Sequence, residues 1–98
     1  MKYHEIKLNH DFCDAVLHGE KTFEVRSNDR DYQKGDRIKF VPISRGGTYK
    51  VCHAISEKEY EITYVLNGWG LENGYVALAI KEVKKAPARP IMEKGDQQ

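Results

Sequence analysis

The residues best suited to chemistry lie close together in one short segment, where two cations accompany one carboxylate. Glu24 and Arg26 are two residues apart, and in an extended strand such positions project from the same face. Lys21 stands at the entry to that strand and can lean over the same region. Phe23 and Val25 occupy the alternate positions, where we expect them to anchor the strand in the core. The spacing therefore predicts three charged groups that converge over one point.

These three side chains indicate either binding or catalysis. The guanidinium of Arg26 is a planar fork of donors that suits a phosphate or the edge of a base. Glu24 can hold that fork in place, or accept a hydrogen bond from an exocyclic amine. Lys21 is a candidate base or nucleophile, with Glu24 as its acid/base partner. The plain alternative is a surface ion pair on a strand, which contributes ~0–1 kcal/mol and has no function.

Two aromatic residues flank a glycine-rich loop further along the chain. Trp69 and Tyr75 can stack on a base if their rings are exposed there. An aromatic ring next to a loop more often covers the core, and we favour that interpretation here. Gly68 and Gly70 lack the following helix and the final glycine of a dinucleotide-binding fingerprint.

No pattern in the sequence indicates a metal or a cofactor, and we expect neither. The four histidines lack ligand spacing and cysteine companions; they are His4, His10, His18 and His53. No serine sits in a nucleophile elbow, and no glycine-rich loop ends in Lys-Ser or Lys-Thr.

Hydrophobic periodicity and turn residues predict six strands and one helix. Asn9 is a candidate N-cap for a helix over residues 10–18, whose core face carries Phe12, Ala15 and Val16, and Gly19 can end it. The strands are expected over residues 3–8, 22–26, 37–41, 48–55, 60–66 and 75–83. A short chain with that many strands tends to curl its sheet so that few edges stay unpaired. We therefore expect an α+β fold, a compact β-barrel of about six strands with one N-terminal helix.

Length and composition indicate one domain. The 98 residues are enough for a modest core. We expect a domain over residues 1–85 and a flexible tail over residues 86–98, where prolines and polar residues dominate. No apolar run approaches the ~20 residues that span a bilayer, and no secretory signal is evident. Cys13 and Cys52 show no scaffold or metal spacing, so we predict a cytoplasmic protein with no membrane partner. Nothing in the sequence indicates an oligomeric state.

Charge is unevenly distributed, although the whole chain has a net charge of only +1. Residues 21–50 hold eight basic and four acidic side chains, whereas residues 51–80 hold one basic and four acidic. Such polarity can orient an anionic partner. It is also common in soluble domains that have no such partner.

The charged segment matches the G-x-K-x-x-E-x-R signature of ASCH domains, through Gly19, Lys21, Glu24 and Arg26. Residues 3–83 resemble an ASCH-like family of bacterial and phage proteins, which is similar to the PUA fold. The resemblance implies a β-barrel with a cleft beside the helix, a role in binding RNA, and Lys21, Glu24 and Arg26 as cleft residues.

The resemblance also implies an enzymatic alternative. Some small ASCH relatives are amidohydrolases that deacylate N4-acetylcytidine with a lysine, a threonine and a glutamate. Lys21 matches the lysine, but Glu24 occupies the position of the threonine, and Thr22 lies two residues earlier on the same face. Glu72 is a candidate for the glutamate.

These observations support three functional hypotheses. The first is a binding module whose polar cleft holds RNA or a nucleotide-like small molecule, with ligand-binding residues Lys21, Thr22, Glu24, Arg26, Trp69 and Tyr75. The second is a small amidohydrolase that acts on acylated nucleosides, with Lys21 and Glu24 as catalytic candidates. The third is a protein-interaction module that uses exposed strands or the tail.

Overall fold

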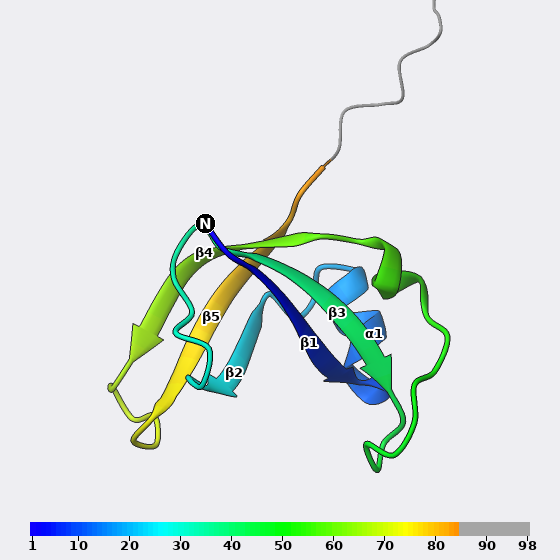
Figure 1. Ribbon diagram of the computed structural model, residues 1–98, viewed down its shortest axis with the longest axis horizontal. Coiled ribbons are helices and arrows are strands. Elements are labelled where there is room, and N and C mark those ends of the chain that lie inside the picture. The colour runs from blue at the N-terminus through cyan, green and yellow to red at the C-terminus, as the bar shows by residue number, and fades with distance from the viewer. Residues whose placement is uncertain (85–98) are drawn as a thin grey trace, which may run out of the picture.

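Five of the six predicted strands and the predicted helix are present in the structure. The computed structural model describes residues 1–84. Its elements, in chain order, are β1 (Tyr3–Asn9), α1 (His10–Leu17), β2 (Phe23–Ser27), β3 (Arg37–Ile43), the 3₁₀ helix η1 (Ala54–Glu57), β4 (Tyr60–Asn67) and β5 (Tyr75–Glu82). Figure 1 shows one curved sheet with α1 packed near β1 and β3. The α+β class is thus confirmed.

The strands form a mixed sheet in the order β1-β3-β4-β5-β2. β1 and β3 run parallel, whereas the other neighbours are antiparallel. The prediction of a closed barrel is wrong, because β1 and β2 remain separate edges of an open sheet. Side chains of β2 and of the turn after it reach β1 instead. Arg26 Nη2 donates to the carbonyl of Lys7, and Arg30 Nη1 donates to the carbonyl of Glu5 at 3.0 Å.

The predicted strand over residues 48–55 is also wrong. That segment makes one isolated bridge, between Ile43 and Lys50, and then turns into η1. Pro42 gives a physical reason for the missing strand. Its carbonyl accepts a hydrogen bond from the N–H of Val51, but proline has no N–H that could donate the second bond of a strand pair. The side chain of His53 then accepts from the N–H of Ile55 at 3.0 Å and begins η1.

The helix begins and ends where the sequence predicts. The side chain of Asn9 accepts from the N–H of Asp11 at 2.9 Å, and Gly19 follows with φ +78°, a conformation that favours glycine. The buried residues of α1, however, are Cys13 and Val16. The expectation that Phe12 faces the core is wrong, since 47% of it is exposed.

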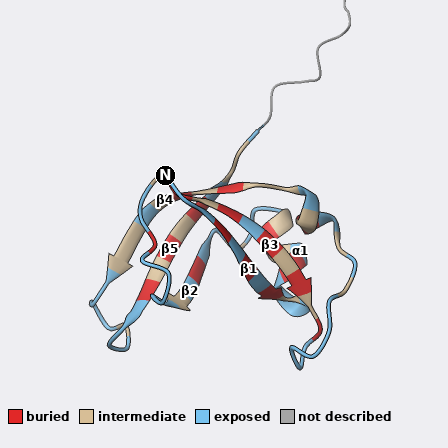
Figure 2. Ribbon diagram, viewed as in Figure 1, coloured by how far each residue is buried: buried red, intermediate tan, exposed pale blue. Residues whose placement is uncertain are grey.

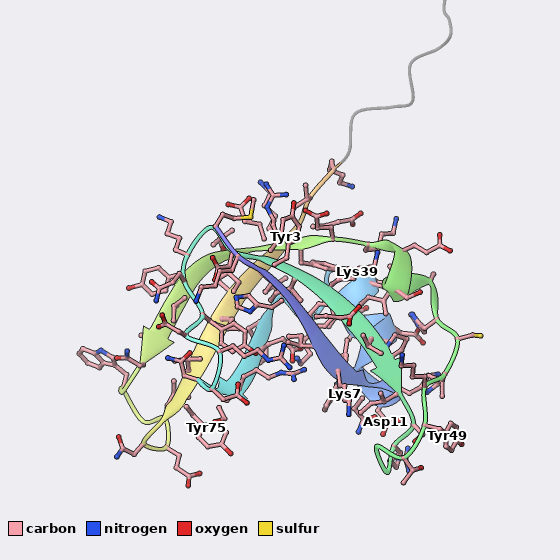
Figure 3. All side chains as sticks on the ribbon, in the orientation of Figure 1. Tyr3, Lys7, Asp11, Lys39, Tyr49 and Tyr75 are labelled. Carbon is pink, nitrogen blue, oxygen red and sulfur yellow. The ribbon has the colours of Figure 1, made fainter. Side chains whose placement is uncertain are left out.

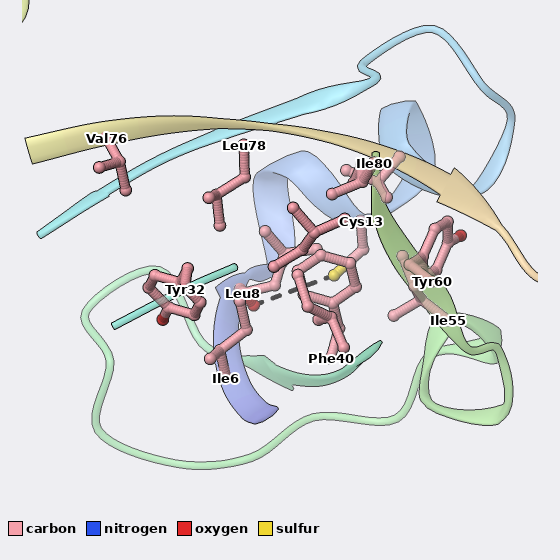
Figure 4. Close-up of a cluster of buried hydrophobic side chains, with 13 residues drawn as sticks. Ile6, Leu8, Cys13, Tyr32, Phe40, Ile55, Tyr60, Val76, Leu78 and Ile80 are labelled. Carbon is pink, nitrogen blue, oxygen red and sulfur yellow. Dashed lines mark hydrogen bonds between the residues drawn. The ribbon is translucent and has the colours of Figure 1, made fainter. Parts of the chain in front are cut away.

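The core lies between the inner face of the sheet and α1. Figure 2 shows buried and more exposed positions alternating along the strands, and Figure 4 shows side chains from β1, α1, β3 and β5 meeting in one cluster. Ile6, Leu8, Phe40 and Leu78 are among its fully buried members. Cys13 is buried there as a free thiol.

A polar network, not predicted from the sequence, holds the start of β1 to the start of β3. Nε2 of the buried His4 lies 2.8 Å from Oδ2 of the buried Asp36. The backbone N–H groups of Lys2 and Gln33 also donate to that carboxylate. The buried ring of Tyr32 packs edge-on against His4, with centroids 4.7 Å apart. Burial raises the pKa of Asp36, but these hydrogen bonds outweigh it and lower the pKa below its ordinary value.

Within residues 1–84, no helix has the length and apolar character needed to cross a membrane. The flexible tail predicted over residues 86–98 lies outside the described residues.

Candidate functional site

The segment after α1 forms β2, whose pairing with β5 decides which side chains point inward. Glu24 lies opposite Leu78, which is fully buried, so both side chains share the inner face. Glu24 is accordingly only 4% exposed. Phe23 and Val25 point the other way and are 50% and 49% exposed. The prediction that these two residues anchor β2 in the core is therefore wrong.

The buried carboxylate of Glu24 is neutralised by the two predicted cations. Lys21 Nζ donates to Glu24 Oε2, and Arg26 donates through Nε and Nη2 to Oε1 at 3.2 Å each. Lys21 also donates to the carbonyl of Phe23 at 2.8 Å. Both cations keep part of their side chains exposed, whereas that of Glu24 is nearly enclosed. A buried carboxylate is tolerated when it is paired in this way, so the predicted convergence of the three groups is confirmed.

A pocket of about 520 Å³ opens over this cluster at the free edge of β2. We call it the β2 pocket. It is lined by Leu8, Asn9, Phe12, Lys21, Phe23, Glu24, Val25, Arg26, Ser27 and Tyr75. Its volume is within the range of small-molecule sites.

Three aromatic rings on the wall of the β2 pocket are partly exposed. Phe12, Phe23 and Tyr75 come from α1, β2 and β5 and are exposed by about half or somewhat less. Tyr75 is the first residue of β5, and Figure 3 shows its position there. The Lys21 ammonium lies 5.1 Å from the ring centroid of Phe12 and 4.9 Å from that of Phe23, within cation–π range. The pocket thus combines flat apolar surfaces with positive charge.

The remaining predicted ligand residues lie elsewhere. Thr22 lines a neighbouring hollow of about 220 Å³, which shares Lys21 with the β2 pocket. Trp69 does not line the β2 pocket and is 89% exposed, so the idea that it covers the core is wrong. Glu72 lines a third hollow, at the loop between β4 and β5.

Sequence reasoning missed six of the residues that line the pocket: Leu8, Asn9, Phe12, Phe23, Val25 and Ser27. Phe12 belongs to the apolar pattern of α1, and its helical spacing from Ala15 and Val16 suggested burial. The signal that distinguishes it is the pair Cys13 and Val16, which also has helical spacing and occupies the core face instead.

No group of histidine, cysteine, aspartate and glutamate side chains in residues 1–84 is arranged to hold a metal ion.

Comparisons with known proteins place the chain in a family. Part of the chain is 46% identical over 37 residues to an uncharacterized 12.9 kDa protein in the GpA 3′ region of Escherichia phage P2. That match covers 38% of this chain and 34% of the phage protein, so it spans about a third of the relative's length. The fold is similar to the crystal structure of hypothetical protein PH0355, with a TM-score of 0.53 and 16% identity. This likeness covers 85% of this chain and 100% of the other. Residues 3–80 match the family described as Domain of unknown function (DUF3850), and the chain belongs to that family.

Proposed function

We propose that the chain is a binding module that holds a nucleotide or single-stranded RNA in the β2 pocket. The observation that carries the proposal is the arrangement of a buried, charge-paired Glu24 beneath partly exposed aromatic rings and two cations. Flat rings stack on bases of any sequence, and lysine and arginine contact phosphates or base acceptors. Both kinds of surface meet in one pocket.

The hydrogen bonds of the cluster assign a separate role to each charged group. Both oxygens of Glu24 already accept from Lys21 and Arg26. Glu24 therefore positions the two cations, and we assign the main contacts with the ligand to Lys21 and Arg26. Arg26 Nη1 makes no hydrogen bond within residues 1–84, so it is available to donate to a ligand. The charged part of the pocket thus favours ligands that present acceptor atoms, as phosphates and base carbonyls do.

The resemblance to ASCH domains supports the same proposal. Lys21, Glu24 and Arg26, which carry the motif, all line the β2 pocket. Membership of the wider ASCH/PUA-like group is part of this proposal, because the family match itself carries no assigned function.

The test is a titration of uridine monophosphate and of a short oligouridylate at low salt. We expect Lys21→Ala combined with Arg26→Ala to weaken both affinities at least tenfold, because two donors to the ligand are lost. The matched control is Lys34→Ala with Lys50→Ala, which removes the same charge from exposed residues outside this pocket. Equal affinities of the cluster variant and the wild-type protein would refute the proposal.

A deacylase acting on acylated nucleosides is the second candidate, favoured by the direct contact of Lys21 with Glu24 inside the β2 pocket. Thr22 does not line that pocket, and Glu72 lines a third hollow. A mechanism that needs Lys21, Thr22 and Glu72 at one ligand is therefore not supported. Incubation of N4-acetylcytidine with the protein separates the two candidates. Release of cytidine and acetate that Lys21→Ala abolishes would favour the enzyme; no release at high protein concentration would remove it.

A further inference from the structure

The side of β2, β5 and β4 that faces away from the core is apolar around Ala77 and Ala79, although no described helix or strand covers it. We call this side of the three strands the outer face. Along β5, Val76, Leu78 and Ile80 are buried, so Ala77 and Ala79 point to the outer face. In residues 1–84, α1 packs against β1, β3 and η1 and makes no comparable contact with the other three strands. Figure 1 shows β4, β5 and β2 side by side, apart from α1.

Aromatic and small residues form a regular row on the outer face. Phe23 of β2 and Tyr64 of β4 both pair with Ala79 of β5. Since adjacent strands are about 4.8 Å apart, the two aromatic side chains start about 10 Å apart with only a methyl group between them. Tyr64 is 60% exposed. The row therefore places two partly exposed aromatic residues on either side of Ala79.

The next row repeats the pattern without aromatic rings. Val25 and Leu66 both pair with Ala77. A β-bulge between Ile62 and Tyr64 brings Tyr64 and Leu66 to the outer face. It shifts the alternation by one residue, so that Tyr64 points outward while Ile62 stays in the core. The backbone of Tyr64 is thus held by strand pairing in the sheet and does not belong to a loop.

The outer face is continuous with the β2 pocket. Phe23, Val25 and Tyr75 line the pocket and lie on the outer face as well. The cations Lys21 and Arg26 lie in the β2 pocket beside the outer face. Further along β5, the exposed Lys81 follows Ala79 on the outer face and pairs with Glu61 of β4.

We infer that a single-stranded nucleic acid runs from the β2 pocket across the outer face, with one base in the pocket and a following base stacked on Tyr64. The inference rests on the proposed function and specifies its ligand as a strand and not a free mononucleotide. Bases stack on aromatic rings of a sheet in this manner. The small alanines leave room for flat rings, and the pocket cations Lys21 and Arg26 suit a phosphate of the backbone. A second copy of this chain, which would carry the same cations, is the less suitable occupant.

The experiment compares Tyr64→Ala with the wild-type protein in binding uridine monophosphate and an octanucleotide of oligouridylate. We expect the octanucleotide to bind about tenfold more weakly, equal to ~1.4 kcal/mol, and the mononucleotide to bind unchanged. Tyr64→Phe keeps the ring and should restore the wild-type affinity. Tyr49→Ala is the matched control, because Tyr49 is 66% exposed and lies in Figure 3 at the opposite end of the molecule from Tyr75.

Two results would overturn the inference. One is an octanucleotide affinity that Tyr64→Ala does not change while the Lys21 and Arg26 double variant still weakens binding; the pocket would then act alone, and the proposed function would stand. The other is sedimentation that shows a wild-type dimer which Tyr64→Ala dissociates, because the outer face would then belong to a second copy. Loss of octanucleotide affinity in Tyr64→Ala together with its retention in Tyr64→Phe and Tyr49→Ala supports it.

Discussion

Glu24 is a charged residue at a position that the sheet buries. Burial of an isolated carboxylate costs several kcal/mol, and ion pairing with added hydrogen bonds can offset that cost. Lys21 and Arg26 supply such pairs here, and Arg26 also donates to the carbonyl of Lys7 on β1. The cluster is therefore part of the fold as well as of the candidate site, and its residues constrain one another.

Removal of the central charge should reveal that double role. We expect Glu24→Gln to lower the free energy of unfolding by about 2 kcal/mol, because it leaves two partly buried cations without an anionic partner. Urea denaturation at neutral pH measures this. Glu57→Gln removes a charge from an exposed position on η1 and should change the stability by less than about 0.5 kcal/mol. A Glu24→Gln protein as stable as the wild type would show that the pairing is not structural.

At the scale of elements, polar side chains make the connections that backbone pairing leaves open. Arg26 and Arg30 connect β2 and the turn after it to free carbonyls of β1. Asp36 connects the start of β3 to the start of β1 through His4 and the N–H of Lys2. Both connections involve β1, an edge strand that pairs with a neighbour on one side alone. The site therefore depends on β1, although its charged residues all follow α1.

The Asp36 connection should give the protein a measurable pH dependence. Hydrogen bonds lower the pKa of Asp36 in the folded state against the raising effect of burial. A lowered pKa contributes stability that is complete above the unfolded value of about 3.9 and is lost as pH falls through the folded value. We expect Asp36→Asn to cost about 2 kcal/mol at pH 7. The difference from the wild type should shrink when urea denaturation is repeated below about pH 4. A difference that stays constant with pH would contradict this.

At the scale of the whole molecule, charge predicts how RNA binding should respond to salt. The net charge is +1, so the chain has little general attraction for a polyanion. Binding should instead depend on local cations, of which Lys21 and Arg26 line the pocket.

If these two cations make the phosphate contacts, the logarithm of the affinity should fall with the logarithm of salt concentration with a slope of about −1.4. Titrations of the oligouridylate over a range of KCl concentrations measure that slope. The Lys21 and Arg26 double variant should bring it close to zero, whereas the Lys34 and Lys50 variant should leave it unchanged. A steep slope that survives in the double variant would indicate a different, more diffuse binding surface.

The sequence by itself determined the local structure and the grouping of the charged residues. Asn9 and Gly19 define the helix ends through capping and a left-handed turn, which depend on neighbours along the chain. The proximity of Lys21, Glu24 and Arg26 likewise follows from their spacing on one segment.

Only the tertiary structure decided which face of β2 is buried. Periodicity of two assigns alternate side chains to opposite faces but does not say which face points inward. The pairing of Glu24 with Leu78 placed the carboxylate inside and turned Phe23 and Val25 outward. The open sheet was decided in the same way, because closure depends on contacts between distant strands, and here two arginine side chains occupy the place of a strand ladder. Apolar residues at alternate positions of a strand by themselves indicate burial in the core. In β2, the pairing with β5 instead places Phe23 and Val25 on the wall of a pocket and on an exposed surface.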